Sequence, residues 1–253
     1  CIYRKMREIV KIGELGAIRR TNWLITNWYR PQAYYDSGDW RATWSGEGGG
    51  VLLNQCPHQL DLWQWICGLP VKIHAKMKYG KWHDIEVEDD VSCWCEYANG
   101  ATGTFITSTG DCPGTNRFEI VCDGGTLVCD KTSLKLYRLD PWEPEYSKTT
   151  KSVFGKPKVI EEIPELEGEN TQHVGVLNAF RDAILNGGKL VADGREGING
   201  LMLSNAMHLS DWLNKEVELP IDEELYYNLL KEKIASSKAK TAEAVDGDTE
   251  GSY

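Results

Sequence analysis

One histidine and two polar neighbours in an apolar stretch are the strongest candidates for chemistry. Asn54, His58, Asp61 and Trp65 follow one another at spacings of four, three and four residues. Such spacings place side chains in one row along a helix, so Asp61 can hold the His58 ring while Asn54 offers a hydrogen bond to a ligand. An imidazole titrates near neutral pH, which suits a base that takes a hydroxyl proton during an oxidation. The alternative is a structural histidine satisfied by a neighbouring carboxylate.

The glycine-rich stretch ahead of this row does not complete a phosphate-binding motif. Residues 46–51 read Gly-Glu-Gly-Gly-Gly-Val, which fails the pattern G-x-G-x-x-G at its last position. The sequence also contains no Walker, metalloprotease or nucleophile-elbow motif. We therefore expect no dinucleotide to bind this chain alone.

Apolar periodicity and stop signals assign the elements that position these residues. The row lies on a helix over residues 51–67, disturbed near Pro57 and closed by Gly68. Helices are also predicted over 3–11, between 171 and 187, over 194–214 and after 222. Strands are predicted over 17–26, 71–79, 91–97, 101–108, 117–122, 126–130 and 133–139, and residues 141–168 are predicted to be a loop with at most one short strand.

Two turns rich in glycine indicate how the strands connect. Asn99-Gly100 and Asp123-Gly124-Gly125 favour tight hairpins, because their residues accept positive φ. Strands joined by hairpins and followed by helices predict an α+β fold with an open, mainly antiparallel sheet covered by helices on one face. A large uncovered sheet face is usually buried by another subunit, so we expect a homo-oligomer that associates through the other face.

Composition excludes several classes of protein. The chain of 253 residues carries 28 Lys and Arg against 38 Asp and Glu, a net charge of −10, and has no basic cluster. Nucleic acid is therefore not an expected partner, because its binding depends on cationic side chains. No apolar run approaches the ~20 residues of a transmembrane helix, so no membrane association is expected.

The cysteines and remaining histidines give no metal-binding pattern. The eight cysteines include no CxxC pair and no paired histidine spacing, so we predict buried free thiols and no metal. Cys93 and Cys95 point to one face of a strand and are expected to fill the core, with chelation as the alternative. His74, on the polar face of its strand, and His83, next to the acidic segment 84–90, are predicted to be solvated.

Several separated motifs resemble those of the Gfo/Idh/MocA family of NAD(P)-dependent oxidoreductases. They are the run from Gly48 to Gly68, the segment Val87-Glu-Asp-Asp90 before the hairpin over 96–104, the stretch from Thr171-Gln-His173 to Ile184, and residues 194–213. Their order matches the family over nearly the whole chain.

The resemblance implies a domain organisation. Residues 1–20 resemble the junction that follows a Rossmann domain, and that domain, with the lysine it contributes to the active site, is not in this sequence. Residues 17–235 correspond to the C-terminal α+β domain, and 236–253 are expected to be a disordered tail. NAD or NADP would then bind the intact protein, and this chain by itself is predicted to be inactive.

The resemblance also assigns candidate site residues. His58 matches the active-site histidine of the family, and Asn54 occupies a position where many members carry aspartate. Asparagine forms hydrogen bonds but accepts no proton, so the chemistry depends more on His58. Asp61 is expected to act through His58 or as a structural residue.

A segment rich in aromatic residues corresponds to a loop that borders substrate and cofactor in such proteins. Arg30, Tyr34, Trp40 and Arg41 are its candidate ligand contacts, although a loop packed for oligomerisation uses the same residue types. His173 matches a histidine found in some relatives, but it lies in register with an apolar stripe, and a semi-buried structural histidine is the alternative.

These expectations combine into one functional hypothesis. The chain would form the substrate-binding and oligomerising domain of a cytoplasmic NAD(P)-dependent oxidoreductase that acts on a sugar or cyclitol. Two alternatives remain open from the sequence, namely a non-catalytic ligand-binding or assembly module and part of a glycoside-cleaving relative that uses transient oxidation.

Overall fold

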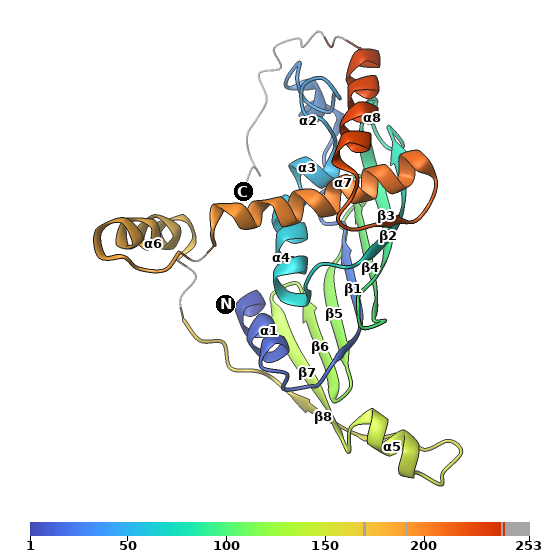
Figure 1. Ribbon diagram of the computed structural model, residues 1–253, viewed down its shortest axis with the longest axis vertical. Coiled ribbons are helices and arrows are strands. Elements are labelled where there is room, and N and C mark those ends of the chain that lie inside the picture. The colour runs from blue at the N-terminus through green and yellow to red at the C-terminus, as the bar shows by residue number, and fades with distance from the viewer. Residues whose placement is uncertain (169–170, 191, 239, 241–253) are drawn as a thin grey trace.

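A nine-stranded open sheet carries helices on one of its faces (Figure 1). The computed structural model describes residues 1–168, 171–190, 192–238 and 240. The strands are β1 (Ile18–Ile25), β2 (Lys72–Tyr79), β3 (Glu88–Glu96), β4 (Thr102–Ser108), β5 (Asn116–Cys122), β6 (Gly125–Asp130), β7 (Ser133–Asp140), β8 (Lys158–Glu162) and β9 (Val217–Glu218). The helices are α1 (Ile2–Lys11), α2 (Gln32–Asp36), α3 (Val51–Asn54), α4 (Pro57–Cys67), α5 (Glu143–Thr149), α6 (Gln172–Asn186), α7 (Gly197–Leu213) and α8 (Glu223–Ser236), with a 3₁₀ turn at Gly194–Glu196.

Alternating side chains explain the strands that the sequence predicts. In β2, Ile73, Ala75 and Met77 are buried and the residues between them are polar. The β3–β4 hairpin turns at Asn99-Gly100, where Gly100 has a φ of 81° and the Asn99 side chain accepts the Ala101 N–H at 3.1 Å. Local pattern and turn chemistry therefore agree with the observed hairpin.

The order of the strands departs from a simple meander. The sheet runs β8-β7-β6-β5-β1-β4-β3-β2-β9, so β1 lies between β4 and β5. It pairs parallel with β4 and antiparallel with β5, and all the other pairs are antiparallel. Trp23 of β1 stacks on Phe118 of β5 at 4.3 Å between ring centroids and meets Phe105 of β4 edge-on at 6.1 Å. Burial of this aromatic cluster accounts for the central place of β1.

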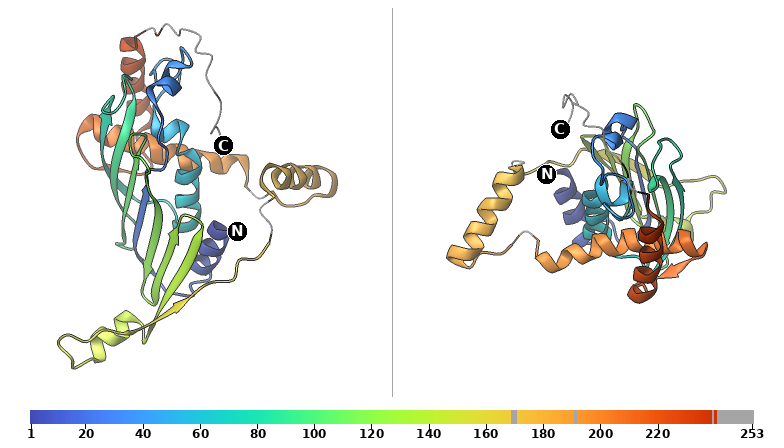
Figure 2. Two further views of the ribbon diagram at one scale, coloured as in Figure 1. Left: turned by 180° about the vertical axis from the view of Figure 1, so that it is seen from behind. Right: turned by 90° about the horizontal axis from the view of Figure 1, so that it is seen from above.

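Helices α1, α4 and α7 cover the core face of the sheet (Figures 1 and 2). Trp63 of α4 stacks on Phe105 at 5.4 Å between centroids, and its indole N–H donates to Thr21 Oγ1 of β1 at 3.2 Å. The predicted α+β fold, with helices on one face of a mainly antiparallel sheet, is confirmed. None of the described helices is long and apolar enough to cross a membrane.

The helix predicted over 51–67 is two helices. α3 ends at Asn54, residues 55 and 56 form a turn, and Pro57 takes the first position of α4. Proline is favoured there because it has no N–H to leave without a partner. Asn54 therefore does not share a helix with His58 and Asp61, and the single row of side chains predicted from their spacing is wrong.

The predicted loop over 141–168 contains α5 as well as the short strand β8. Proline in the first turn of α5, together with Glu143 and Glu145 there, is typical of a helix start. The predicted disordered tail over 236–253 lies largely outside the described residues. Of its described part, Ser236 ends α8 and Lys240 Nζ donates to Tyr35 O at 2.5 Å.

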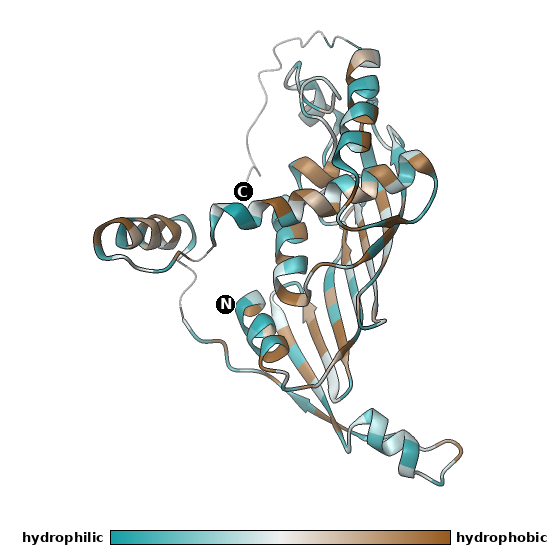
Figure 3. Cartoon of the chain, in the orientation of Figure 1, coloured by the Kyte–Doolittle hydropathy of each residue, from teal (hydrophilic) through white to brown (hydrophobic). Residues whose placement is uncertain are grey.

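Helix α6 stands apart from the sheet and the other helices (Figures 1 and 2). Its predicted apolar stripe is present, yet Leu177 is 68% exposed and Phe180 is 56% exposed. Apolar colouring along this helix is visible in Figure 3. The amphipathic pattern thus predicts the helix but not a packing partner within the described chain.

Candidate functional site

The glycine-rich loop before α3 is anchored to the start of β3. Gly50 and Leu52 donate their N–H groups to the two carboxylate oxygens of Glu88, at 2.8 and 3.1 Å. A Cβ on Gly50 would lie 2.0 Å from the Glu88 carbonyl oxygen, so this close approach requires glycine. The loop and α3 are therefore held at a fixed position against the sheet.

Glu88 also forms a buried pair with His208 of α7. His208 Nε2 lies 3.1 Å from Glu88 Oε2, and both side chains are 0% exposed. The other ring nitrogen, Nδ1, lies 2.9 Å from the Ser204 carbonyl oxygen. Burial lowers the pKa of His208, but the carboxylates of Glu88 and Asp211 and the hydrogen bonds with Glu88 and Ser204 outweigh it and leave the pKa raised.

The adjacent carboxylate, Asp89, organises the opposite loop. It is buried and accepts the backbone N–H groups of Lys81 at 3.0 Å and Trp82 at 2.8 Å. His83 Nδ1 lies 3.2 Å from Asp89 Oδ2, and His83 Nε2 lies 2.8 Å from the Arg30 carbonyl oxygen. The prediction that His83 is solvated is therefore wrong, because its side chain is buried against Asp89.

Asn54 is the centre of a polar network at the end of α3. Its Oδ1 accepts the Tyr34 hydroxyl at 2.8 Å and Gln55 Nε2 at 2.7 Å, and its Nδ2 donates to Glu47. The second carboxylate oxygen of Glu47 accepts the Ala42 N–H at 2.8 Å. Asn54 thus ties the aromatic segment to α3 and keeps one Nδ2 hydrogen for a ligand.

His58 lies at the second position of α4 with an exposed side chain. Within the described part of the chain, neither ring nitrogen has a hydrogen-bond partner, so both are free for a ligand. His58 borders a cavity of about 400 Å³ whose other lining residues are Leu52, Leu53, Pro57, Leu60, Asp61, Gly197, Gly200, Leu201 and Ser204. A mostly apolar cavity with one imidazole at its edge suits a small ligand that packs against the walls and forms a hydrogen bond with His58.

Asp61 lines the same cavity but does not hold the histidine ring. Its Oδ1 accepts Gln64 Nε2 at 2.9 Å, and the described residues show no hydrogen bond between Asp61 and His58. Asp61 thus supports α4 locally in this structure.

Four candidate residues of the aromatic segment gather into one group, which we call the arginine–aromatic cluster (Arg30, Tyr34, Trp40 and Arg41). The guanidinium carbon of Arg41 lies 4.6 Å from the Tyr34 ring centroid and 4.5 Å from that of Trp40. Arg30 lies over the Tyr34 ring at 5.2 Å. Tyr34 connects the cluster to Asn54, so the structure brings these five predicted residues together.

His173 is not part of this assembly. It lies near the start of α6 with an exposed side chain, and α6 is remote from α3 and α4 in every view (Figures 1 and 2). The alternative of a semi-buried structural histidine is also wrong, because the apolar stripe of α6 is exposed.

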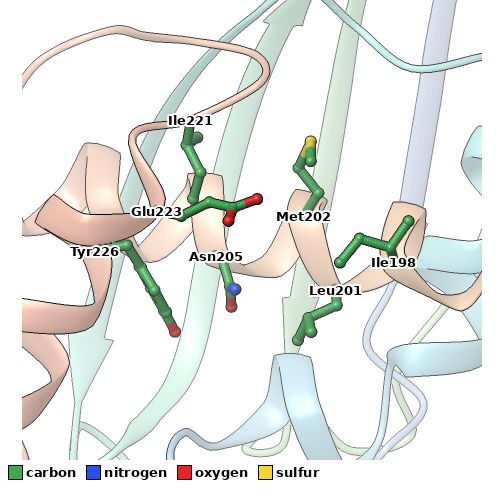
Figure 4. A pocket seen from close by; sticks show the side chains of 7 residues that line it. All are labelled: Ile198, Leu201, Met202, Asn205, Ile221, Glu223 and Tyr226. Atoms are coloured by element: carbon green, nitrogen blue, oxygen red, sulfur yellow. The ribbon is translucent and has the colours of Figure 1, made fainter.

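A second hollow on the other side of α7 contains none of the candidate residues. It has a volume of about 210 Å³ and is lined by side chains of α7, α8 and the segment between them (Figure 4), namely Ile198, Leu201, Met202, Asn205, Ile221, Glu223 and Tyr226. Its lining is largely apolar and offers no pair of groups suited to proton transfer.

Five of the eight cysteines are buried free thiols, as predicted, whereas Cys67 is half-buried and Cys1 and Cys112 are exposed, so the prediction is wrong for these. Burial raises the pKa of Cys56 and of Cys95 to about 12. These thiols therefore stay protonated at neutral pH. The described residues contain no group of three or more His, Cys, Asp or Glu side chains placed to hold a metal ion.

The sequence singles out His58, Asn54 and the arginine–aromatic cluster as candidates, but it does not indicate the roles of Glu88, Asp89 and His208. The acidic run before the β3–β4 hairpin was the available signal for the two carboxylates. His208 lies on an apolar helix, and nothing in its local sequence indicates a partner 120 residues away.

Comparison with known proteins agrees with this architecture. Residues 3–128 match the profile of the GFO/IDH/MocA C-terminal domain. No curated protein sequence matches the chain.

Solved structures share the fold at low sequence identity. The WlbA dehydrogenase from Bordetella pertussis, solved with NADH and UDP-GlcNAcA, is 22% identical with a TM-score of 0.66, and the match covers 87% of this chain and 60% of that chain. The aldose-aldose oxidoreductase from Caulobacter crescentus is 20% identical with a TM-score of 0.63, over 86% of this chain and 60% of that one. A levoglucosan dehydrogenase solved with NADH and levoglucosan is 16% identical with a TM-score of 0.65, over 86% and 65%.

The chain thus spans about 60% of the length of the first of these structures. These structures share its fold, and the family profile gives the assignment. Over residues 3–128, the chain belongs to the family of GFO/IDH/MocA C-terminal domains.

Proposed function

We propose that this chain forms the substrate side of an NAD(P)-dependent oxidoreductase that acts on a sugar or cyclitol, with His58 as the group that accepts the hydroxyl proton. The observation that carries the proposal is the exposed His58 ring, free at both nitrogens on the rim of a 400 Å³ cavity. A neutral imidazole in this position can take a proton from a substrate hydroxyl as the carbon is oxidised. Asn54 and Tyr34 would orient that substrate from the adjacent network.

The glycine-rich loop before α3 does not fit the phosphates of a dinucleotide. At the glycine-rich loop, the N–H groups of Gly50 and Leu52 are occupied by the Glu88 carboxylate, which would also repel a phosphate. In the proposed enzyme, a nicotinamide that takes the hydride is held by a nucleotide-binding domain outside this sequence. The part of the relatives' length that this chain does not span leaves room for such a domain.

Titration calorimetry tests whether the dinucleotide site lies outside this chain. NAD and NADP titrated separately into this chain are expected to give no saturable heat. When the chain follows a nucleotide-binding domain, the combined protein is expected to reduce NAD or NADP with a sugar or cyclitol substrate. Stoichiometric binding of either dinucleotide to this chain alone would overturn the proposal that the nucleotide site lies elsewhere.

We also propose that the sheet face opposite the helices mediates self-association. No described helix covers that face (Figures 1 and 2), and Leu24 and Ile106 are paired neighbours on β1 and β4 that are 38% and 39% exposed. Trp94 on β3 pairs with Thr104, two residues from Ile106 on β4, and is half-buried. Apolar side chains collected on an uncovered face favour burial between subunits.

Light scattering after size-exclusion chromatography tests the association. The wild type is expected to elute as an oligomer, and Ile106→Lys is expected to shift it to the monomer, because a lysine would be buried at the contact. Ile12→Lys is the matched control, since Ile12 is 67% exposed at the end of α1, away from the sheet. A wild type that remains monomeric at high concentration contradicts the proposal.

A further inference from the structure

We propose that Arg30 and Arg41 bind an anionic substituent of the substrate, a carboxylate or a phosphate. The inference deepens the proposed function and rests on it, because it assigns a chemical class to the sugar or cyclitol.

Arg41 is fixed in place by its own neighbours. Its Nε donates to Ser37 Oγ at 3.2 Å, and its Nη1 donates to the Tyr34 hydroxyl at 3.0 Å. The guanidinium also lies against the Trp40 and Tyr34 rings at 4.5 and 4.6 Å from their centroids. A guanidinium held by two hydrogen bonds and two ring contacts loses little further freedom when it binds a ligand.

The backbone of Arg30 is anchored to the sheet and to a buried histidine. Its N–H donates to the Thr109 carbonyl oxygen at 3.0 Å, and its own carbonyl accepts from His83 Nε2 at 2.8 Å. His83 is fixed in turn by the buried Asp89. The side chain of Arg30 lies over the Tyr34 ring, so both guanidinium groups converge on one tyrosine.

Neither guanidinium is neutralised within the described part of the chain. Arg117 and Arg138 have carboxylate partners between 2.5 and 3.0 Å, whereas no described carboxylate oxygen lies within 4.0 Å of a nitrogen of Arg30 or Arg41. The nearby Glu47 is engaged by Asn54 and the Ala42 N–H. In a chain with a net charge of −10, two half-buried arginines without a partner acid indicate a site for an external anion.

The remaining donors match that chemistry. The described residues supply no acceptor for Arg41 Nη2 or for Nε and Nη2 of Arg30, and these N–H groups are free for carboxylate or phosphate oxygens. The Arg41, Tyr34 and Asn54 side chains form a continuous chain of hydrogen bonds, at 3.0 and 2.8 Å. A bound anion would therefore be connected through Tyr34 to Asn54, the last residue of α3.

Binding measurements with three related sugars test the inference. D-glucuronate, D-glucose 6-phosphate and D-glucose are titrated into the full chain, and tryptophan fluorescence or calorimetry reports binding. At least one of the two anionic sugars is expected to bind about tenfold or more tightly than glucose, and added salt is expected to weaken that preference. Whichever anion is preferred identifies carboxylate or phosphate as the substituent.

Variants that remove the arginine charges test whether the preference for the anionic sugar depends on Arg30 and Arg41. Arg41→Gln and Arg30→Gln are each expected to reduce the preference for the anionic sugar about tenfold, whereas Arg41→Lys retains part of it. Arg117→Gln is the control, because Arg117 is paired on β5 with Glu119 and Asp130. Unchanged thermal unfolding of the glutamine variants shows that they are folded.

The outcomes separate the two proposals. Equal binding of glucose and both anionic sugars, or a preference that survives in Arg30→Gln and Arg41→Gln, overturns the anion site and leaves the proposed function standing. Failure of all three sugars to bind contradicts the anion site and the proposed sugar-binding function together.

Discussion

Replacing Glu88 by alanine is expected to lower the free energy of unfolding by about 3–5 kcal/mol, the range for breaking a buried charged pair. The Glu88 carboxylate accepts the Gly50 and Leu52 N–H groups and lies 3.1 Å from His208 Nε2, with no exposure to solvent. Without it, the two N–H groups at the start of α3 lose their acceptor and the buried His208 ring loses its ion-pair partner. Urea unfolding measures the loss.

A surface glutamate provides the control for this variant. Glu161 on β8 pairs with Lys135 at 2.6 Å, and the side chains of that pair are 43% and 48% exposed. Glu161→Ala is expected to change the stability far less, because exposed ion pairs are screened by water. A similar loss in the two variants would show that Glu88 does not anchor the glycine-rich loop.

The pairing of Glu88 with His208 also predicts how stability depends on pH. His208 Nδ1 lies 2.9 Å from Ser204 O and Nε2 lies 3.1 Å from Glu88 Oε2, so the carboxylate beside the ring favours the protonated imidazole. Accordingly the pKa of His208 in the folded protein is raised above 6.5, although burial opposes this. The stabilisation is therefore fully present below about pH 6.5, the pKa of an unfolded histidine, and is lost as the pH rises through the folded value.

Unfolding experiments across this pH range separate the pair from other titrating groups. The free energy of unfolding of the wild type is expected to fall as the pH rises above about 6.5, and the fall is expected to be smaller in Glu88→Gln. An identical pH dependence in the wild type and Glu88→Gln is the result that contradicts a charged pair.

Much of the fold is encoded locally, and the sequence predicts that part. The alternation in β2, the Asn99-Gly100 turn and the glycine at the end of α6 each act through the conformation of adjacent residues. Two features depend on distant partners. β1 is placed beside β4 by pairing of residues 20–25 with 102–107, and nothing in either segment specifies that register. The apolar stripe of α6 likewise defines a helix without defining what the helix contacts.

The candidate site also combines residues that the local sequence indicates with interactions that it does not indicate. His58 and Asn54 stand out because their types and spacing resemble a chemical motif, although the turn before Pro57 separates them onto two helices. The interactions that hold the site are long-range: Glu88 reaches Gly50 across 38 residues, and Glu88 and His208 come from β3 and α7. A histidine among loop carboxylates resembles a solvated residue in the sequence, but the fold buries His83 against Asp89, which is why the solvated prediction for His83 is wrong.

Replacing His58 by alanine is expected to lower kcat by about 10²–10⁴-fold in a protein that joins a nucleotide-binding domain to this chain. The ring is exposed on the cavity rim and has no hydrogen-bond partner among the described residues, so its removal costs the fold little. The loss is expected in kcat rather than in KM. His58 interacts with the moving proton in the transition state, whereas the contacts of other residues with the bound substrate remain.

His74→Ala provides the matched control, since His74 lies on the polar face of β2. Its kcat is expected to equal that of the wild type, and thermal unfolding of both variants is expected to match the wild type. A folded His58→Ala protein with full kcat would remove His58 from the reaction. Because Asn54 cannot accept a proton, the base would then have to come from the nucleotide-binding domain or from solvent, and the cavity beside α4 would retain only a binding role.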